Sequence, residues 1–138
     1  NLPMFNEDLE GDKLPDSVIE LKNKLSKANA LLISSPEYNY SIPPVLKNAL
    51  DWASRGNQQP LSGKPVGIIS ASPSLLGGAR VQYHIRQVCV ALNMYPVNRP
   101  EVFIAEADKK IDFQGNLSDE KTKEFIKELL QALIESIK

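Results

Sequence analysis

Three short apolar runs constrain the fold of this chain more than any other sequence feature. They cover residues 30–34, 65–71 and 101–105. Unbroken apolar character over four or five residues is typical of a strand that is buried on both faces, as in a parallel sheet. Helical patterns alternate with these runs, and their apolar positions fall on one face: Leu14, Val18, Leu21 and Leu25; Val45, Leu46, Ala49, Leu50 and Ala53; Val81, Ile85, Val88 and Leu92; Phe125, Leu129, Leu130, Leu133, Ile134 and Ile137.

The alternation of helix and strand predicts an α/β fold with a doubly wound parallel sheet. Right-handed crossovers then place helices on both faces of the sheet. Two local signals mark helix starts. Pro43-Pro44 can open the helix over residues 45–53, because the first turn of a helix needs no N–H from proline. Ser118 is expected to cap the last helix, which contains residues 125–137.

Composition excludes several classes of protein. The 138 residues fit one domain, residues 1–138, and 16 basic against 17 acidic side chains leave a net charge of −1. No basic tract indicates nucleic-acid binding, and no apolar run is long enough for a membrane span. One cysteine excludes an internal disulfide and favours a reducing, cytoplasmic location. With one histidine as well, a Cys/His zinc site is not expected, and we predict no metal site.

The loop after the first apolar run is the first candidate site. Open parallel sheets bind ligands beyond the carboxyl ends of their strands, and residues 35–44 form an unusually long connection there. Pro36 ends the strand, Tyr38 and Tyr40 offer flat aromatic surface, and Asn39 tolerates unusual backbone angles. The alternative is a packed loop whose tyrosines only cover the sheet edge.

The loop after the second run is the other candidate. Ser72 can donate or accept a hydrogen bond at the mouth of the crevice. Gly77-Gly78 permits close backbone approach and leads into the third helix, whose N-terminus presents free N–H groups. The alternative is a strand-to-helix turn that simply needs glycine.

The remaining reactive or bulky residues favour structural roles. His84 lies off the apolar stripe of its helix and is expected to be exposed or at an interface. Cys89 is expected to be a small buried hydrophobe, and Trp52 to pack on a neighbouring helix or subunit. Residues 106–112 are predicted to be a mixed-sign loop, and residues 119–121 to be the solvated start of the last helix.

Residues 35–52, SPEYNYSIPPVLKNALDW, closely resemble the signature of the NADPH-dependent FMN reductases, which are flavodoxin-like oxidoreductases. The segments GKPV at 63–66, GGAR at 77–80 and QYHIRQ at 82–87 are similar to the quinone and chromate reductase branch. LPMFNED at 2–8 is similar to the loop before that family's second helix. The resemblance covers nearly the whole chain.

The resemblance implies FMN as cofactor and NADPH or NADH as hydride donor. It places Pro36, Glu37, Tyr38, Asn39 and Tyr40 on the loop that holds the isoalloxazine ring, and Ser72 and Gly77 on the second flavin-contacting loop. The flavin carries the chemistry, so no catalytic side chain is expected.

Two features depart from the family pattern. Ser74 stands where a glycine is common, and the phosphate-binding pattern Gly-Ser-x-Arg-x-x-Ser does not occur in this sequence. Three strong strands also fall short of a flavodoxin-like sheet of order 2-1-3-4-5. We therefore expect that the first strand, phosphate loop and first helix are missing from this chain.

The leading hypothesis is an FMN-dependent NAD(P)H oxidoreductase that reduces quinones, free flavin or other small electron acceptors. The alternative is a non-enzymatic, flavodoxin-like FMN-binding electron carrier, although the charge of −1 differs from the strong acidity of such carriers. The resemblance also implies a homodimer or homotetramer, with candidate interface residues Arg80, Tyr83, His84, Gln87 and Trp52.

Overall fold

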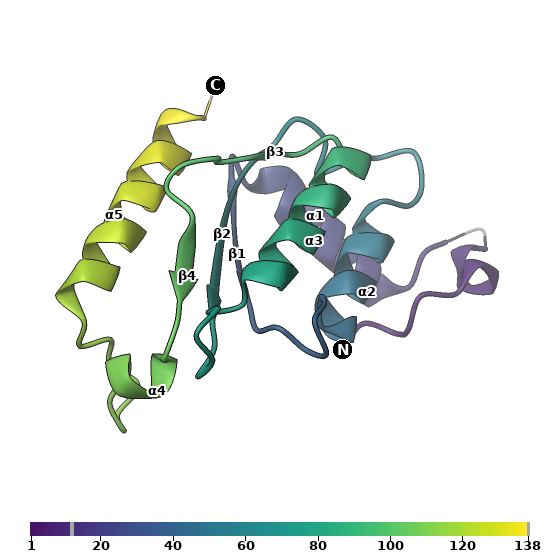
Figure 1. Ribbon diagram of the computed structural model, residues 1–138. Helices are drawn as coiled ribbons and strands as arrows, with labels where there is room; N and C mark the ends of the chain where they lie inside the picture. Colours follow the sequence, from purple (N-terminus) through teal and green to yellow (C-terminus); the bar gives the residue numbers. More distant parts are fainter. Residues whose placement is uncertain (12, 138) are drawn as a thin grey trace.

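The computed structural model describes residues 1–11 and 13–137, and it places helices on both faces of a parallel sheet (Figure 1). The strands are β1 (Leu31–Ser35), β2 (Pro65–Ala71), β3 (Tyr95–Pro96) and β4 (Val102–Ile104). The helices are η1 (Glu7–Glu10), α1 (Asp16–Lys27), α2 (Pro44–Ala53), α3 (Ala79–Ala91), α4 (Ala107–Lys110) and α5 (Glu120–Glu135). The predicted doubly wound α/β fold is confirmed.

The strand β2 lies at the centre of the sheet. It pairs with β1 in parallel from Leu31↔Val66 to Ser35↔Ser70. Its other edge carries β3 at the first residues and β4 at the last residues, again in parallel. Since all these pairings are parallel, the carboxyl ends of β1, β2 and β4 meet at one edge of the sheet.

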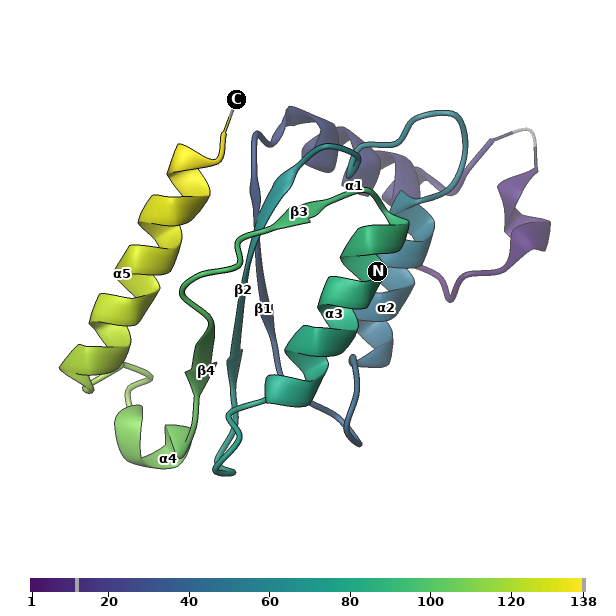
Figure 2. The same cartoon turned by 45° about the horizontal axis from the view of Figure 1, so that its top comes forward.

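Two hydrophobic clusters separate the layers. Helix α5 covers one face of the sheet, and α1, α2 and α3 lie on the other (Figures 1 and 2). One cluster joins β1 and β2 to α2 and α3, with Ile33, Ile68 and Ile85 among its buried members. The other joins β4 to α5, with Val102 and Leu129 at its centre. Burial of apolar surface on both faces explains why the strands are continuous apolar runs.

Three details differ from the sequence-based expectations. A two-residue strand, β3, precedes β4, and residues 106–112 contain the short helix α4 where a loop was expected. The predicted cap of the last helix is also wrong. The Asp119 carboxylate accepts a hydrogen bond from the Thr122 N–H at 2.8 Å, whereas the Ser118 hydroxyl donates to the Lys110 carbonyl. Because α5 begins at Glu120, Asp119 occupies the N-cap position and Ser118 lies one residue before it.

Helix α2 begins at Pro44, as the proline pair predicts. The tryptophan of this helix does not face a partner subunit, so Trp52 is excluded as an interface residue. Its side chain is completely buried, its Nε1 donates to the Pro3 carbonyl at 2.8 Å, and the Phe5 ring packs edge to face on it at 5.0 Å between centroids. The first residues of the chain therefore cover α2.

The single cysteine is buried within α3, as predicted. Burial raises the pKa of the Cys89 thiol to about 11, so the thiol is protonated at neutral pH. A buried, protonated thiol is a small hydrophobe and a poor nucleophile.

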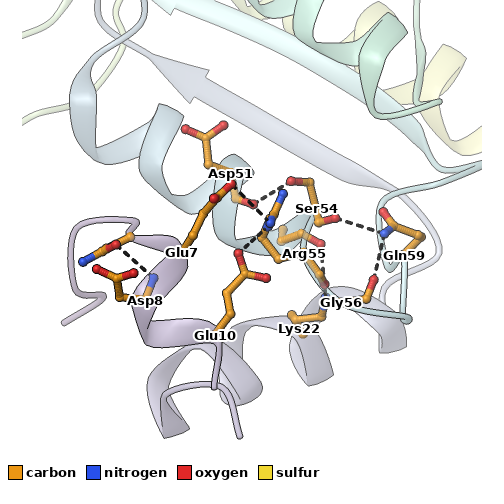
Figure 3. Close-up of polar contacts among 11 residues, drawn as sticks. Glu7, Asp8, Glu10, Lys22, Asp51, Ser54, Arg55, Gly56 and Gln59 are labelled. Atoms are coloured by element: carbon orange, nitrogen blue, oxygen red, sulfur yellow. Dashed lines mark hydrogen bonds and ion pairs between the residues drawn. The ribbon is translucent and has the colours of Figure 1, made fainter. Parts of the chain in front are cut away.

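A buried lysine holds the segment that follows α2 (Figure 3). The Lys22 ammonium, on α1, donates to the carbonyl oxygens of Ala53 at 3.4 Å and Gln58 at 2.8 Å, and also to that of Arg55. Burial lowers the pKa of Lys22, against the opposing effect of the Glu10 charge. Three backbone acceptors replace the water that this ammonium loses.

We predict that Lys22→Met destabilises the protein by about 1–3 kcal/mol, because buried carbonyl oxygens lose their donor. Lys24→Met is the matched control on the same helix. Lys24 is exposed and pairs with the exposed Glu20, so its loss is expected to change stability by less than about 0.5 kcal/mol. Urea unfolding of both variants measures the difference, and equal midpoints would contradict the prediction.

Candidate active site at the carboxyl edge of the sheet

The two predicted site loops lie at the same edge of the sheet (Figure 2). Residues 36–43 follow β1 and residues 72–78 follow β2. The N-terminal end of α3 contacts both, because Arg80 binds Glu37 and the Ala79 N–H donates to the Leu76 carbonyl. This is the edge at which open parallel sheets bind ligands. The structure therefore brings together the regions that the sequence singled out separately.

The first loop is a tight turn. The Tyr38 N–H donates to the Ser41 carbonyl at 3.1 Å, and the Ser41 N–H donates to the Tyr38 carbonyl at 2.9 Å. The two residues between them both have positive φ, 46° at Asn39 and 69° at Tyr40. A two-residue turn of this kind needs such angles at both central positions. The unusual backbone expected at Asn39 is confirmed, and the same strain at Tyr40 was not foreseen.

This turn presents aromatic surface and free backbone donors together. The Tyr38 and Tyr40 side chains are 58% and 66% exposed. Among residues 1–11 and 13–137, no protein group accepts a hydrogen bond from the N–H of Asn39 or Tyr40. Flat aromatic faces beside unused N–H donors suit a planar heteroaromatic ring that carries carbonyl oxygens and ring nitrogens.

The Glu37 side chain is engaged within the protein. One carboxylate oxygen accepts a hydrogen bond from Arg80 Nη1 at 2.9 Å, and the other accepts from the Val81 N–H at 3.1 Å. Burial alone would raise the pKa of Glu37. The hydrogen bonds from Arg80 and Val81, together with the Arg80 charge, outweigh burial and lower this pKa below its ordinary value. The carboxylate thus stays ionised and joins the loop to the start of α3.

The structure shows His84 less exposed than expected, and its place at an interface stays a prediction. Its ring is half-buried, and its Nδ1 lies 2.9 Å from the Ser41 hydroxyl oxygen. The contact crosses 43 positions of sequence, so no local pattern could reveal it. His84 is therefore a second point at which α3 contacts the turn.

In the second loop, Ser72 extends the sheet. Its N–H donates to the Ile104 carbonyl at 3.0 Å. Its hydroxyl donates to the Ser74 hydroxyl at 3.0 Å and accepts from the Ser74 N–H at 3.1 Å. Ser74, which departs from the family's glycine, therefore binds the side chain that the resemblance places against the flavin.

The glycine pair in this loop approaches protein backbone. Gly77 is buried with φ of 56°, and a Cβ atom there would lie 2.7 Å from the Ala105 nitrogen and 2.8 Å from the Ile104 carbonyl carbon. Such distances are far below van der Waals contact, and positive φ adds strain for any other residue. Gly77 thus fits the loop closely against the end of β4.

A buried polar pair that the sequence analysis missed fixes the same loop. The Ser70 hydroxyl donates to the Gly77 carbonyl at 2.6 Å. The Gln82 side-chain nitrogen donates to the Ser70 hydroxyl and to the Val102 carbonyl, both at 2.8 Å. Gln82 is fully buried beside the apolar stripe of α3. The sequence signal that could have revealed this pair was a polar residue, Gln82, directly after Val81 of the apolar stripe.

These residues fit the flavin ring that the resemblance implies. The turn supplies exposed aromatic surface and the free N–H groups of Asn39 and Tyr40, and the second loop is rigidly placed beside it. Pro36, Glu37, Tyr38 and Gly77 complete the predicted set, all at this edge. That they contact FMN stays a prediction.

A separate cavity of about 740 Å³ lies at the opposite edge of the sheet. Lys64, Tyr95 and Arg99 are among its lining residues, which stand near the amino ends of the strands. The Lys64 ammonium is already bound to the Ala28 carbonyl. Strand direction therefore favours the carboxyl edge as the site.

Neither a metal centre nor a membrane span emerges from residues 1–11 and 13–137. These residues contain no group of three or more His, Cys, Asp or Glu side chains placed to hold a metal ion. Their helices are all too short or too polar to cross a lipid bilayer.

We predict that Gly77→Ala destabilises the protein by more than the roughly 1–2 kcal/mol that a left-handed conformation costs an ordinary residue. Gly63→Ala is the matched control, because Gly63 also has positive φ, at 77°, but its added Cβ meets no atom within 4 Å. Thermal unfolding of both variants separates backbone strain from collision. An equal loss of stability in both variants would show that the backbone of residues 103–105 moves away from the added methyl group at no cost in free energy.

Comparisons with known proteins agree with the site. The model of the family described as NADPH-dependent FMN reductase matches residues 1–109. An NAD(P)H-dependent FMN reductase of Pseudomonas aeruginosa is 48% identical over 132 residues, which cover 96% of this chain and 71% of that protein. A quinone reductase of Escherichia coli K12 is 40% identical, over 99% of this chain and 74% of that protein.

A solved structure agrees as well. FerB, a flavoenzyme NAD(P)H:(acceptor) oxidoreductase from Paracoccus denitrificans, superposes with a TM-score of 0.88 at 34% identity, over 99% of this chain and 75% of that one. This likeness confirms the flavodoxin-like fold. The family model spans most of the chain, and the sequence identities are high over nearly its whole length. The chain belongs to the NADPH-dependent FMN reductase family.

Proposed function

We propose that this chain forms the flavin-ring site of an FMN-dependent NAD(P)H oxidoreductase that reduces quinones and other small electron acceptors. The observation that carries the proposal is the strained turn at residues 38–41, which presents two tyrosines and two unused N–H groups at the ligand-binding edge of the sheet. The names of the Pseudomonas and Escherichia relatives support the activity and the class of acceptor.

The protein's contribution is to bind and orient. The chemistry that FMN supplies when bound is hydride acceptance from NAD(P)H and electron transfer to the acceptor. The N–H groups of Asn39 and Tyr40 are available to hydrogen-bond the polar edge of the ring and stabilise negative charge there. Tyr38 and Tyr40 offer surface that excludes water from one side of the ring.

The direct test is to purify the protein, add FMN and record the absorbance and fluorescence of the flavin. We expect FMN to bind and NADPH to be oxidised faster when 1,4-benzoquinone is added. Bound flavin that NADPH does not reduce in stopped flow would instead indicate an electron carrier. A protein that neither binds FMN nor oxidises NADPH would overturn the proposal.

One substitution makes the assignment of the site specific. Tyr38→Ala is expected to weaken FMN binding by about three- to tenfold, the effect of losing one aromatic contact. Tyr95→Ala is the matched control, since Tyr95 is 59% exposed against 58% for Tyr38 but lies at the opposite edge of the sheet. Equal FMN affinities for the two variants would remove Tyr38 from the site.

We further propose that the protein is a homo-oligomer through the outer face of α3. Tyr83, Gln87 and Val90 recur at helical spacing on this face, and Tyr83 and Val90 are 50% and 80% exposed. Light scattering at micromolar concentration is expected to give a dimer or tetramer, and Tyr83→Lys to lower the mass. A monomeric mass for the unmodified protein would refute this.

A further inference from the structure

One arginine contacts the strained turn from outside. Arg80 stands at the start of α3, and its Nη1 donates to the Glu37 carboxylate at 2.9 Å. The same guanidinium lies over the Tyr40 ring, with Cζ 3.8 Å from the ring centroid. Glu37 precedes the turn and Tyr40 lies within it, so one side chain holds the turn at two places.

The turn needs such support. Asn39 and Tyr40 are both in left-handed conformations, which are especially unfavourable for an aromatic residue. Within the turn itself, the only backbone support among the described residues is the pair of hydrogen bonds between Tyr38 and Ser41. Strained backbone persists only where the surrounding structure constrains it.

The arginine contacts are better suited to fixing geometry than to adding stability. The Arg80 side chain is 36% exposed, and ion pairs with that much solvent contribute little to folding. A planar guanidinium can pair with a carboxylate at its edge and stack on a ring with its face at the same time. A lysine ammonium has no flat face, so it could keep the ion pair and lose the stack.

We propose that Arg80 is a positioning residue that holds the turn at residues 38–41 in the form that presents the Asn39 and Tyr40 N–H groups to the flavin ring. The proposal rests on the proposed function, and Arg80 acts through Glu37 and Tyr40 without touching the reacting atoms. Arg80→Lys removes the stack with the smallest change in charge.

The chain offers a matched control. Arg55 pairs with Glu10 at 2.6 Å (Figure 3). Its guanidinium carbon also lies 5.3 Å from the centroid of the Phe5 ring, and its side chain is 38% exposed. It follows the C-terminal end of α2, whereas the turn precedes the N-terminal end of that helix. Arg55→Lys therefore removes a similar arrangement away from the site.

Two measurements test the proposal. By NMR hydrogen exchange without flavin, the Ser41 amide is expected to exchange about tenfold faster in Arg80→Lys and unchanged in Arg55→Lys. By flavin fluorescence, the Kd for FMN is expected to rise about tenfold in Arg80→Lys only, because the planar stack of the guanidinium on the Tyr40 ring is lost. In a Tyr40→Ala background, Arg80→Lys should change the Kd by less than about twofold, because the ring it stacks on is gone.

The outcomes separate the two proposals. Ser41 exchange that is the same in Arg80→Lys and the unmodified protein overturns the positioning role, whether or not FMN binds. A full tenfold effect of Arg80→Lys in the Tyr40→Ala background also overturns it, since the arginine then acts independently of the ring. Unmodified protein that shows no FMN binding refutes the proposed function, and the exchange measurement still decides the role of Arg80.

Discussion

The central strand β2 is the constraint on which the rest of the structure depends. It is buried along nearly its whole length, and it is the only described strand paired on both edges, with β1 on one side and β3 and β4 on the other. Since every pairing is parallel, the chain must cross over the sheet between strands, and those crossovers are the helices. Parallel pairing also brings the carboxyl ends of β1, β2 and β4 to one edge. The location of the candidate site is thus a consequence of strand direction.

Helix α3 links the two loops of the candidate site at that edge. Its first residues hold the turn after β1 through Arg80, Val81 and His84. The next turn of the helix sends Gln82 into the buried contact with Ser70, which in turn holds the loop after β2. A ring placed between the two loops would meet groups that are already oriented. Orientation before binding lowers the entropy cost of holding a ligand.

The sequence identified the loops of the candidate site and little of what holds them in place. Pro36, Tyr38 and Asn39 were identifiable because their residue types and their place after a buried strand are local properties. The glycine at position 77 was also identifiable, although its close approach proved to be to the backbone of residues 103–105. The contacts of Glu37 with Arg80 and of Ser41 with His84 each cross 43 positions. Contacts of that range leave no local pattern, and Trp52 was misjudged for the same reason, since its indole N–H binds the Pro3 carbonyl 49 positions away.

By itself, the sequence determined the order of the main helices and strands, the parallel sheet, the start of α2 and the loops that bear the candidate site. Hydrophobic periodicity and proline placement act over a few residues, so these features can be predicted without a fold. Only the tertiary structure decided how the loops are held: which carboxylate the arginine binds, which ring it covers, and which carbonyls the buried Lys22 satisfies. These contacts depend on which helix surfaces pack against the sheet and its loops, and that packing joins segments that are distant in the sequence.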